Sequence, residues 1–309
     1  SGETPDLAHC VDKLCTLLRF SIVATFVFDG PNGPDFKRGK AVNKRPHGPH
    51  PLTGEFQSLS KAFGFHCHTA LGEAAAELAY LNRLQLVDLI LADNEEILVL
   101  GATHLVYRCG SPRVWNHMLT CYSLEEDMAS IYTSEAIERE AHLSFGGLLL
   151  MAVLIGGDYN VIGLPGCTEN VAYSLAQRGL GDSLLVAAQN LGPTELRGFL
   201  TVWRDTLEMA LTEHGRGLVV AQVPETFPDP RILDLYVRPL TSWSHGRPGP
   251  SVSEWNPRML DIVSISRLCE DLCPWGTATA LPNRLINCLL PGLCVKRLAQ
   301  VPISLGPQN

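Results

Sequence analysis

The chain has no long hydrophobic run and no leader-like start. Its longest apolar stretch extends only from Leu148 to Ile155, which is too short to span a bilayer. The first residues, Ser1 to Thr4, contain neither the basic segment nor the apolar segment of a secretory signal. These absences predict a protein that is intracellular, not secreted and without a membrane partner.

Paired cysteine motifs are also lacking. The 10 cysteines are scattered, and none of them forms a CxxC unit. Cys269 and Cys273 are one helical turn apart but have no second pair, so we interpret the cysteines as reduced core thiols. His66-Cys67-His68 is a weak pattern for zinc.

Positive charge is scarce. The formal net charge of −8 argues against broad, nonspecific attraction to nucleic acid, although a local basic patch can still bind it. The chain is 46% hydrophobic and 18% charged over 309 residues, which is enough apolar material for one large domain or two.

The most informative stretch surrounds Asp158, in Ile155-Gly156-Gly157-Asp158-Tyr159. An acid at the end of a buried segment is costly unless it has a cation or a hydrogen-bond partner. The glycine-rich turn Gly163-Leu164-Pro165-Gly166 follows, and such turns let a backbone approach a phosphate. The pattern indicates either phosphoryl-transfer chemistry at a metal or a solvated aspartate that caps the next helix.

The order of elements predicts an α/β fold with a mainly parallel sheet. We expect helices over 7–20, 53–63 and 73–86, strands over 22–28, 65–68, 87–91 and 104–107, and a helix or tight turn over 96–101. Asp29, Asp93 and Asn94 follow strands and Glu73 starts a helix, so these side chains could converge on one rim of the sheet. Beyond Asp158 the pattern is helical to about residue 214, then again over 257–272 and 281–290 after a linker over 244–254.

Four ordered motifs resemble a known family. They are Phe26-Val27-Phe28-Asp29-Gly30-Pro31 with Lys37-Arg38-Gly39-Lys40, His68-Thr69-Ala70-Leu71-Gly72-Glu73-Ala74, Gly156-Gly157-Asp158-Tyr159, and Gly163-Leu164-Pro165-Gly166. In this order and spacing they resemble the XPG-type flap endonuclease family, and most of all its Holliday junction resolvase branch in the fungal form. The resemblance covers roughly residues 3 to 240 and, more weakly, the tail from Trp255 to Leu298.

The resemblance implies a fold and a chemistry. It implies a PIN-like nuclease domain over 1–155, a helix-two-turn-helix element with a helical extension over 156–243, and a small, mostly helical C-terminal module over 255–309. It also implies a nuclear protein that cuts branched DNA with two Mg²⁺ or Mn²⁺ ions about 4 Å apart. Such ions require a cluster of oxygen ligands.

Carried over position by position, the metal site is degenerate. The resemblance assigns metal and catalytic roles to Asp29, Glu73, Glu96 and Asp158, with Glu96 longer by one methylene than the family's acid. Two further acid positions fall on Ala75 and Asn94, and Glu77 is a partial substitute one helical turn beyond Glu73. The family's first strand, with its acid, would precede this chain, which predicts a fragment or a shortened paralogue with an open sheet edge. We therefore expect weak binding of Mg²⁺ or Mn²⁺.

The expected DNA contacts are also reduced. Gly163 and Gly166 match the family's phosphate-binding turn, but Thr168 replaces its last glycine. The best candidates for DNA backbone contacts form the basic segment Lys37, Arg38, Lys40, Lys44 and Arg45, whose alternative is a solvated loop.

Two functions remain open. One is a structure-specific endonuclease for branched or flapped DNA, weakly active or inactive in this form. The other is a noncatalytic descendant that binds branched nucleic acid or a protein partner, for instance at an open sheet edge.

Overall fold

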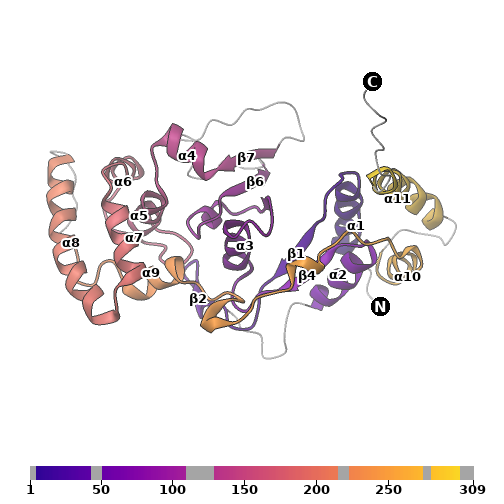
Figure 1. The fold of residues 1–309 in the computed structure, drawn as a ribbon, viewed down its shortest axis with the longest axis horizontal. Coiled ribbons are helices and arrows are strands. Elements are labelled where there is room, and N and C mark those ends of the chain that lie inside the picture. The colour runs from indigo at the N-terminus through magenta and orange to yellow at the C-terminus, as the bar shows by residue number, and fades with distance from the viewer. Residues whose placement is uncertain (1–4, 43–50, 109–128, 215–222, 274–279, 300–309) are drawn as a thin grey trace, which may run out of the picture. The chain divides into compact units, whose positions relative to one another are not determined.

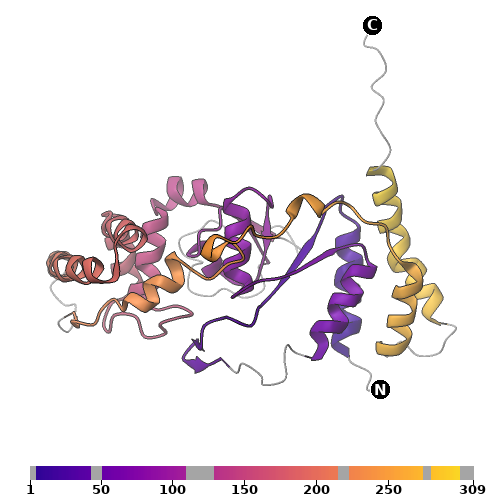
Figure 2. The same cartoon turned by 60° about the horizontal axis from the view of Figure 1, so that its bottom comes forward.

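A computed structural model describes residues 5–42, 51–108, 129–214, 223–273 and 280–299 (Figures 1 and 2). The chain forms two compact units. The terminal unit comprises residues 1–28, 45–69 and 250–309, and the central unit comprises 29–44 and 70–249. The three domain ranges expected from the sequence stay a prediction.

The terminal unit combines both ends of the chain. Helices α1 (Pro5–Leu18) and α2 (Pro51–Ala62) pack with α10 (Ile262–Leu272) and α11 (Ala280–Ala299), which Figure 1 colours at the opposite end of its scale. Their shared core includes Leu18, Phe63 and Ile265, all fully buried. Strands β1 (Thr25–Phe28) and β4 (His66–Thr69) pair in parallel beside these helices.

The His-Cys-His pattern lies on β4. His66 is buried, and its Nε2 lies 2.8 Å from the Asn256 backbone oxygen. The Trp255 ring centroid lies 6.0 Å from that of His68. These contacts give the β4 side chains a packing role within the terminal unit.

The central unit contains a three-stranded sheet. Strand β5 (Ile90–Leu91) pairs in parallel with β6 (His104–Arg108), and β6 pairs antiparallel with β7 (Ala129–Thr133). Helix α3 (Ala74–Arg83), the 3₁₀ turn η1 (Glu95–Leu98) and α4 (Ser134–Ala141) surround this sheet. Asn82, almost fully buried, accepts hydrogen bonds from the Thr103 and His104 amides, 2.8 and 2.9 Å away, and thereby fixes the start of β6 against α3.

A helical bundle forms the rest of the central unit. It comprises α5 (Phe145–Ile155), α6 (Glu169–Ala176), α7 (Leu180–Asn190), α8 (Pro193–His214) and α9 (Pro230–Val237) (Figure 1). Helix α5 is apolar on all sides and is therefore enclosed. It approaches α7 so closely that a Cβ on Gly181 would lie 2.0 Å from the Gly146 oxygen. Trp203 of α8 is buried, as expected, and donates its Nε1 hydrogen to the Leu180 oxygen.

The α/β class is confirmed, with α6 and α7 at the place expected for the helix-two-turn-helix element. In the described ranges the parallel pairs β1–β4 and β5–β6 lie in separate sheets, and β2 (Phe36–Lys37) pairs with β3 (Lys40–Ala41) in a small hairpin. Two short 3₁₀ turns, η2 (Ser244–Gly246) and η3 (Val252–Glu254), fall in the predicted linker. None of the described helices is long and apolar enough to cross a membrane.

Candidate functional site

Asp158 lies just beyond the C-terminal end of α5, where two glycines shape the chain. Gly156 has a φ of +100°, a conformation that other residues rarely adopt. A Cβ on Gly157 would lie 2.2 Å from Glu96 Oε1 and 2.5 Å from the Tyr236 hydroxyl. The second glycine is therefore required for Glu96 and Tyr236 to approach the backbone at Asp158.

The Asp158 carboxylate is held by cations of the same unit. Arg38 Nε lies 2.5 Å from Oδ1 and Arg38 Nη2 lies 3.3 Å from Oδ2, so the guanidinium is bidentate. Lys37 Nζ lies 3.2 Å from Oδ2. Asn94 Nδ2 also donates to Oδ2, over 3.3 Å. The sequence context of Asp158 required a cation or a hydrogen-bond partner, and the protein itself supplies two cations, Arg38 and Lys37.

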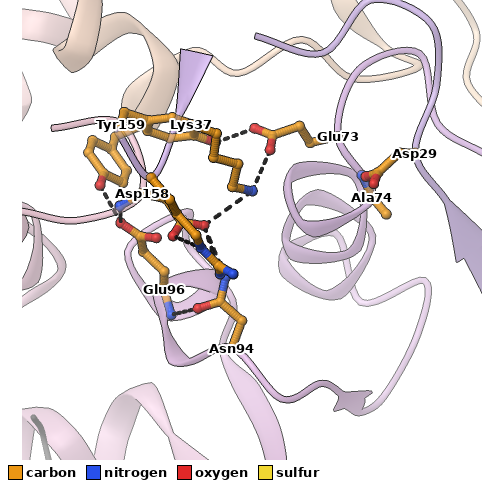
Figure 3. Close-up of polar contacts among 10 residues, drawn as sticks. Asp29, Lys37, Glu73, Ala74, Asn94, Glu96, Asp158 and Tyr159 are labelled. Atoms are coloured by element: carbon orange, nitrogen blue, oxygen red, sulfur yellow. Dashed lines mark hydrogen bonds and ion pairs between the residues drawn. The ribbon is translucent and has the colours of Figure 1, made fainter. Parts of the chain in front are cut away.

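Both cations come from the β2–β3 hairpin. Arg38 and Gly39 form its two-residue turn, with φ of +52° and +70°, which is the left-handed pattern of a type I′ turn. Lys37 Nζ also lies 2.5 Å from Glu73 Oε1 (Figure 3). Lys37 and Arg38 were predicted to contact DNA, and here they face the acids. Lys40 is exposed on the same hairpin, while Lys44 and Arg45 lie outside the described residues.

Two buried tyrosines complete the network. Tyr159 donates its hydroxyl hydrogen to Glu73, and Tyr236 of α9 donates to Glu96. The two rings pack edge to face, with centroids 4.7 Å apart. Glu96 Oε1 also accepts from the Asp158 amide over 2.6 Å. Three carboxyl groups from separate elements are therefore fixed by hydrogen bonds and ion pairs.

The pKa values reflect this arrangement. Burial raises the pKa of Asp158, but hydrogen bonds from Arg38 and the attraction of Lys37 outweigh burial, so the pKa lies below its ordinary value. Burial raises the pKa of Glu96 to about 7, against hydrogen bonds from Tyr236 and the Asp158 amide. Burial also raises the pKa of Tyr159 and of Tyr236, so both hydroxyls remain donors at neutral pH. Asp158 is therefore ionised at neutral pH, whereas Glu96 retains part of its proton near pH 7.

The remaining ligand candidates point elsewhere. Asp29 accepts a hydrogen bond from the Ala74 amide over 2.8 Å, and Figure 3 shows it apart from Lys37 and Asp158. Glu77 is fully buried and accepts from the Ser242 amide over 2.8 Å, which anchors the chain after α9 to α3. The structure therefore brings together Glu73, Glu96 and Asp158 but neither Asp29 nor Glu77.

A divalent ion does not fit this donor set. Mg²⁺ requires several oxygen ligands that face it. Ala75 offers none, and Asn94 turns its NH₂ group to Asp158 while its Oδ1 accepts from the Glu96 amide. Within the described part of the chain, no group of three or more His, Cys, Asp or Glu side chains is placed to hold a metal ion. In this structure, Lys37 and Arg38 balance the negative charge of the cluster.

The predicted phosphate turn follows α5. Gly163 and Gly166 have φ of +61° and +85°. A Cβ on Gly163 would lie 2.4 Å from the Leu154 oxygen, and the Leu164 amide donates to that oxygen over 2.8 Å. The glycine is therefore needed for the turn itself, and its contact with phosphate stays a prediction.

Comparison with known proteins finds a family match over part of the chain. Residues 64–158 match the XPG I-region. Mouse Flap endonuclease GEN homolog 1 is 26% identical over 200 residues, which are 59% of this chain and 21% of that protein. The chain thus spans about a fifth of the length of this curated relative.

Solved structures agree with this match. The Holliday junction-resolving enzyme GEN1, in complex with product DNA, Mg²⁺ and Mn²⁺, has a TM-score of 0.71 and 25% identity, over 98% of this chain and 68% of that chain. The catalytic core of Rad2 with DNA substrate has a TM-score of 0.62 and 21% identity, over 94% of this chain and 85% of that chain, and shows the shared fold.

The I-region match and these similarities relate the chain to the XPG family of nucleases. Within the family the similarity is to GEN1, in the Holliday junction resolvase branch, as the motifs indicated. The fungal form and the degenerate metal site stay predictions.

Sequence reasoning missed the two tyrosines and the inward-facing cations. Tyr159 follows Asp158 directly, so its position in the motif was a usable signal. Tyr236 had only a weak signal in the sequence. It lies 140 residues from Glu96, and any large apolar residue could occupy the same buried position on α9.

Proposed function

We propose that this chain is an XPG-type module that binds branched DNA in the nucleus and cuts it weakly or not at all. The single observation that supports this function is the pairing of Asp158 with Arg38 and Lys37 inside a site that has Ala75 and Asn94 at ligand positions. The relatives named GEN1 and Rad2 were solved with DNA, which supports branched or flapped DNA as the ligand.

Divalent metal binding follows the same reasoning. A carboxylate that already has two cations attracts a third cation less strongly, because their charges repel it. Any Mg²⁺ or Mn²⁺ would be held by Glu73, Glu96 and Asp158 and would have to displace Lys37 and Arg38. We therefore propose weak binding, in the millimolar range or worse, because affinity follows the charge of the ligand set.

The test separates binding from cutting. Binding is measured by fluorescence anisotropy on a nicked four-way junction, a 5′-flap and a linear duplex of equal length, in EDTA. Cleavage of the same labelled substrates is then measured in Mg²⁺ and in Mn²⁺. Tighter binding of the branched substrates with little or no cutting supports the proposal. Efficient cutting that Asp158→Asn abolishes would contradict it.

A gain-of-function variant gives a second test. The triple change Ala75→Glu, Asn94→Asp and Glu96→Asp, made with the family's N-terminal strand and its acid restored, should create or raise divalent-dependent cutting. Asp158→Asn in that background should remove the gain, because Asp158 would be a required ligand. A triple variant as inactive as the parent would show that the missing carboxylates are not what limits cutting.

The second candidate is a protein partner at the sheet of the central unit. Leu91 of β5 pairs with Val106, which pairs with Ile131 of β7, so these three apolar residues lie in one row across the strands. Leu91 and Ile131 are 62% and 61% exposed, although strand residues of this kind are usually covered. If a partner binds this row, Leu91→Lys should abolish the interaction and leave DNA binding unchanged.

A further inference from the structure

Helices α1 and α11 come from opposite ends of the sequence and pack side by side in the terminal unit. Near the start of their contact, Arg284 Nη2 lies 3.5 Å from Asp12 Oδ2. Near its end, a Cβ on Gly292 would lie 2.4 Å from the Leu18 Cβ. Residue numbers rise together along the contact, so the two helices run in the same direction.

A cysteine occupies the midpoint of this contact on each helix. Cys15 lies midway between the two contact residues of α1, three positions from each, and Cys288 lies midway between those of α11, four positions from each. Residues three or four apart lie on one side of a helix, so this register places Cys15 opposite Cys288. The Cys15 thiol is in hydrogen-bonding contact with the Cys288 thiol, as the register requires.

The two helices are close enough here for a disulfide. Such a bond needs two Cβ atoms that lie about 4 Å apart. Gly292 is one helical turn beyond Cys288, and its Cβ position is only 2.4 Å from the Leu18 Cβ, so the backbones already come within this range. Cys15 and Cys288 are both free thiols. They are therefore placed to form a bond while the helices stay packed.

The two thiols differ in their access to oxidants. Cys15 is only 3% exposed, whereas Cys288 is half-buried. Burial and, next, the neighbouring Cys288 raise the pKa of the Cys15 thiol to about 12, so Cys15 stays protonated at neutral pH. Oxidation of a cysteine requires exposure and thiolate character. An oxidant therefore reaches Cys288 first, and Cys15 is the buried neighbour that reacts second.

We propose that Cys15 and Cys288 form a reversible disulfide that joins α1 to α11 when the protein meets a peroxide. Hydrogen peroxide oxidises the Cys288 thiol to a sulfenic acid and is itself reduced, which releases one water. The Cys15 sulfur then displaces the hydroxyl group of the sulfenic acid, and the Cys15 proton leaves with that group as a second water. Two thiols thus give two electrons to one peroxide. The bond ties together the two ends of the terminal unit, so the stability of this unit depends on its redox state.

The first test maps the bond in the unmodified protein. Reduced protein is treated with hydrogen peroxide, the remaining thiols are blocked with iodoacetamide, and the chain is digested with trypsin without reduction. Mass spectrometry should find residues 14–19, which contain Cys15, linked to residues 285–296 through Cys288. The second peptide also contains the exposed Cys294, so fragmentation must locate the bond. In urea the same treatment should scatter the pairing over other cysteines.

The second test measures stability. Oxidised protein should melt roughly 5–10 °C above reduced protein, as expected for a typical disulfide in a chain of this size, and dithiothreitol should reverse the shift. Cys288→Ala should abolish both the bond and the shift. The matched control Cys294→Ala, which removes an exposed thiol from the same helix, should keep both.

Three results would overturn the inference. One is native protein that forms no bond between Cys15 and Cys288 after peroxide treatment. Another is a bond that forms equally well in urea, since the fold would then not direct the pairing. The third is a bond that leaves the melting temperature unchanged. None of these measurements involves DNA, so they stand apart from the test of the proposed function.

Discussion

Glu96 is a carboxyl group placed where ionisation is unfavourable. Its side chain is half-buried and accepts hydrogen bonds from the Asp158 amide and the Tyr236 hydroxyl. Glu96→Gln keeps an acceptor oxygen for both donors and removes the charge. We therefore expect this substitution to stabilise the protein at high pH and to have little effect at low pH.

The magnitude follows from the pKa. Burial raises the pKa of Glu96 from 4.5 to about 7, so between these values the folded state holds a proton that the unfolded state has lost. The free energy of unfolding of the parent protein therefore falls as the pH rises through this window and levels off above about pH 7. Each pKa unit corresponds to ~1.36 kcal/mol, which sets an upper bound of ~3 kcal/mol. Partial exposure of Glu96 reduces the expected gain of Glu96→Gln to ~1–2 kcal/mol at pH 8.

The assay is urea unfolding followed by circular dichroism at pH 5, 6.5 and 8 and at constant ionic strength. Glu95→Gln removes the same charge from the same 3₁₀ turn, so the gain of Glu96→Gln is measured relative to it. The gain should grow from near zero at pH 5 to its full value at pH 8. A gain that is constant over this range, or that shrinks as the pH rises, would refute the placement of Glu96.

Three further substitutions test packing, the buried amide and DNA contacts. Gly181→Ala should lower the free energy of unfolding by ~1–3 kcal/mol, because α5 and α7 must separate to make room for the new Cβ. The control Gly198→Ala lies in α8 with open space around it, and it should raise the free energy of unfolding by ~0.5–1 kcal/mol in the same thermal or urea melts. Asn82→Ala should lower the free energy of unfolding by at least ~3 kcal/mol, because several buried backbone groups lose their hydrogen bonds. The control Asn190→Ala, at an exposed position, should change the free energy of unfolding by no more than ~0.5 kcal/mol in urea titrations. Fluorescence anisotropy between ~50 and ~200 mM salt should show weaker and less salt-dependent binding of four-way junctions after replacement of the basic segment by alanine, and unchanged binding would place the DNA on another surface. That last replacement covers Lys37, Arg38, Lys40, Lys44 and Arg45.

Local elements could be predicted well from the sequence. The helix expected over 7–20 is α1 (Pro5–Leu18), and the strand expected over 65–68 is β4 (His66–Thr69), because apolar periodicity records which face each segment buries. Strand β7 (Ala129–Thr133) was not anticipated. The pairing of α1 with α11 was not anticipated either, since a contact across more than 250 residues leaves no local pattern.

The site could be predicted in part. The motifs predicted Glu73, Glu96 and Asp158 as site residues, and the structure joins these three in one network. They also predicted Asp29, whose carboxylate instead accepts a hydrogen bond from the first amide of α3. The direction of Lys37 was not evident from the sequence. A basic loop suggests an external anion, whereas buried carboxylates attract the nearest cation because an unpaired buried charge is costly.

The terminal unit is built from segments on both sides of the central unit in the sequence, so it is completed only after the central unit has been synthesised. Helices α1 and α2 emerge early, but α10 and α11, which cover their apolar sides, follow residue 250. Leu18 packs directly against Gly292 of α11, where an added Cβ would lie 2.4 Å from the Leu18 Cβ, so Leu18 stays uncovered until α11 is made. Until α10 and α11 emerge, the nascent chain therefore presents an uncovered helical pair while all residues of the central unit are already available, and it needs protection from aggregation during that interval. A premature stop near residue 249 would make that exposure permanent, so we expect its product to be degraded rather than to act as a shortened nuclease module.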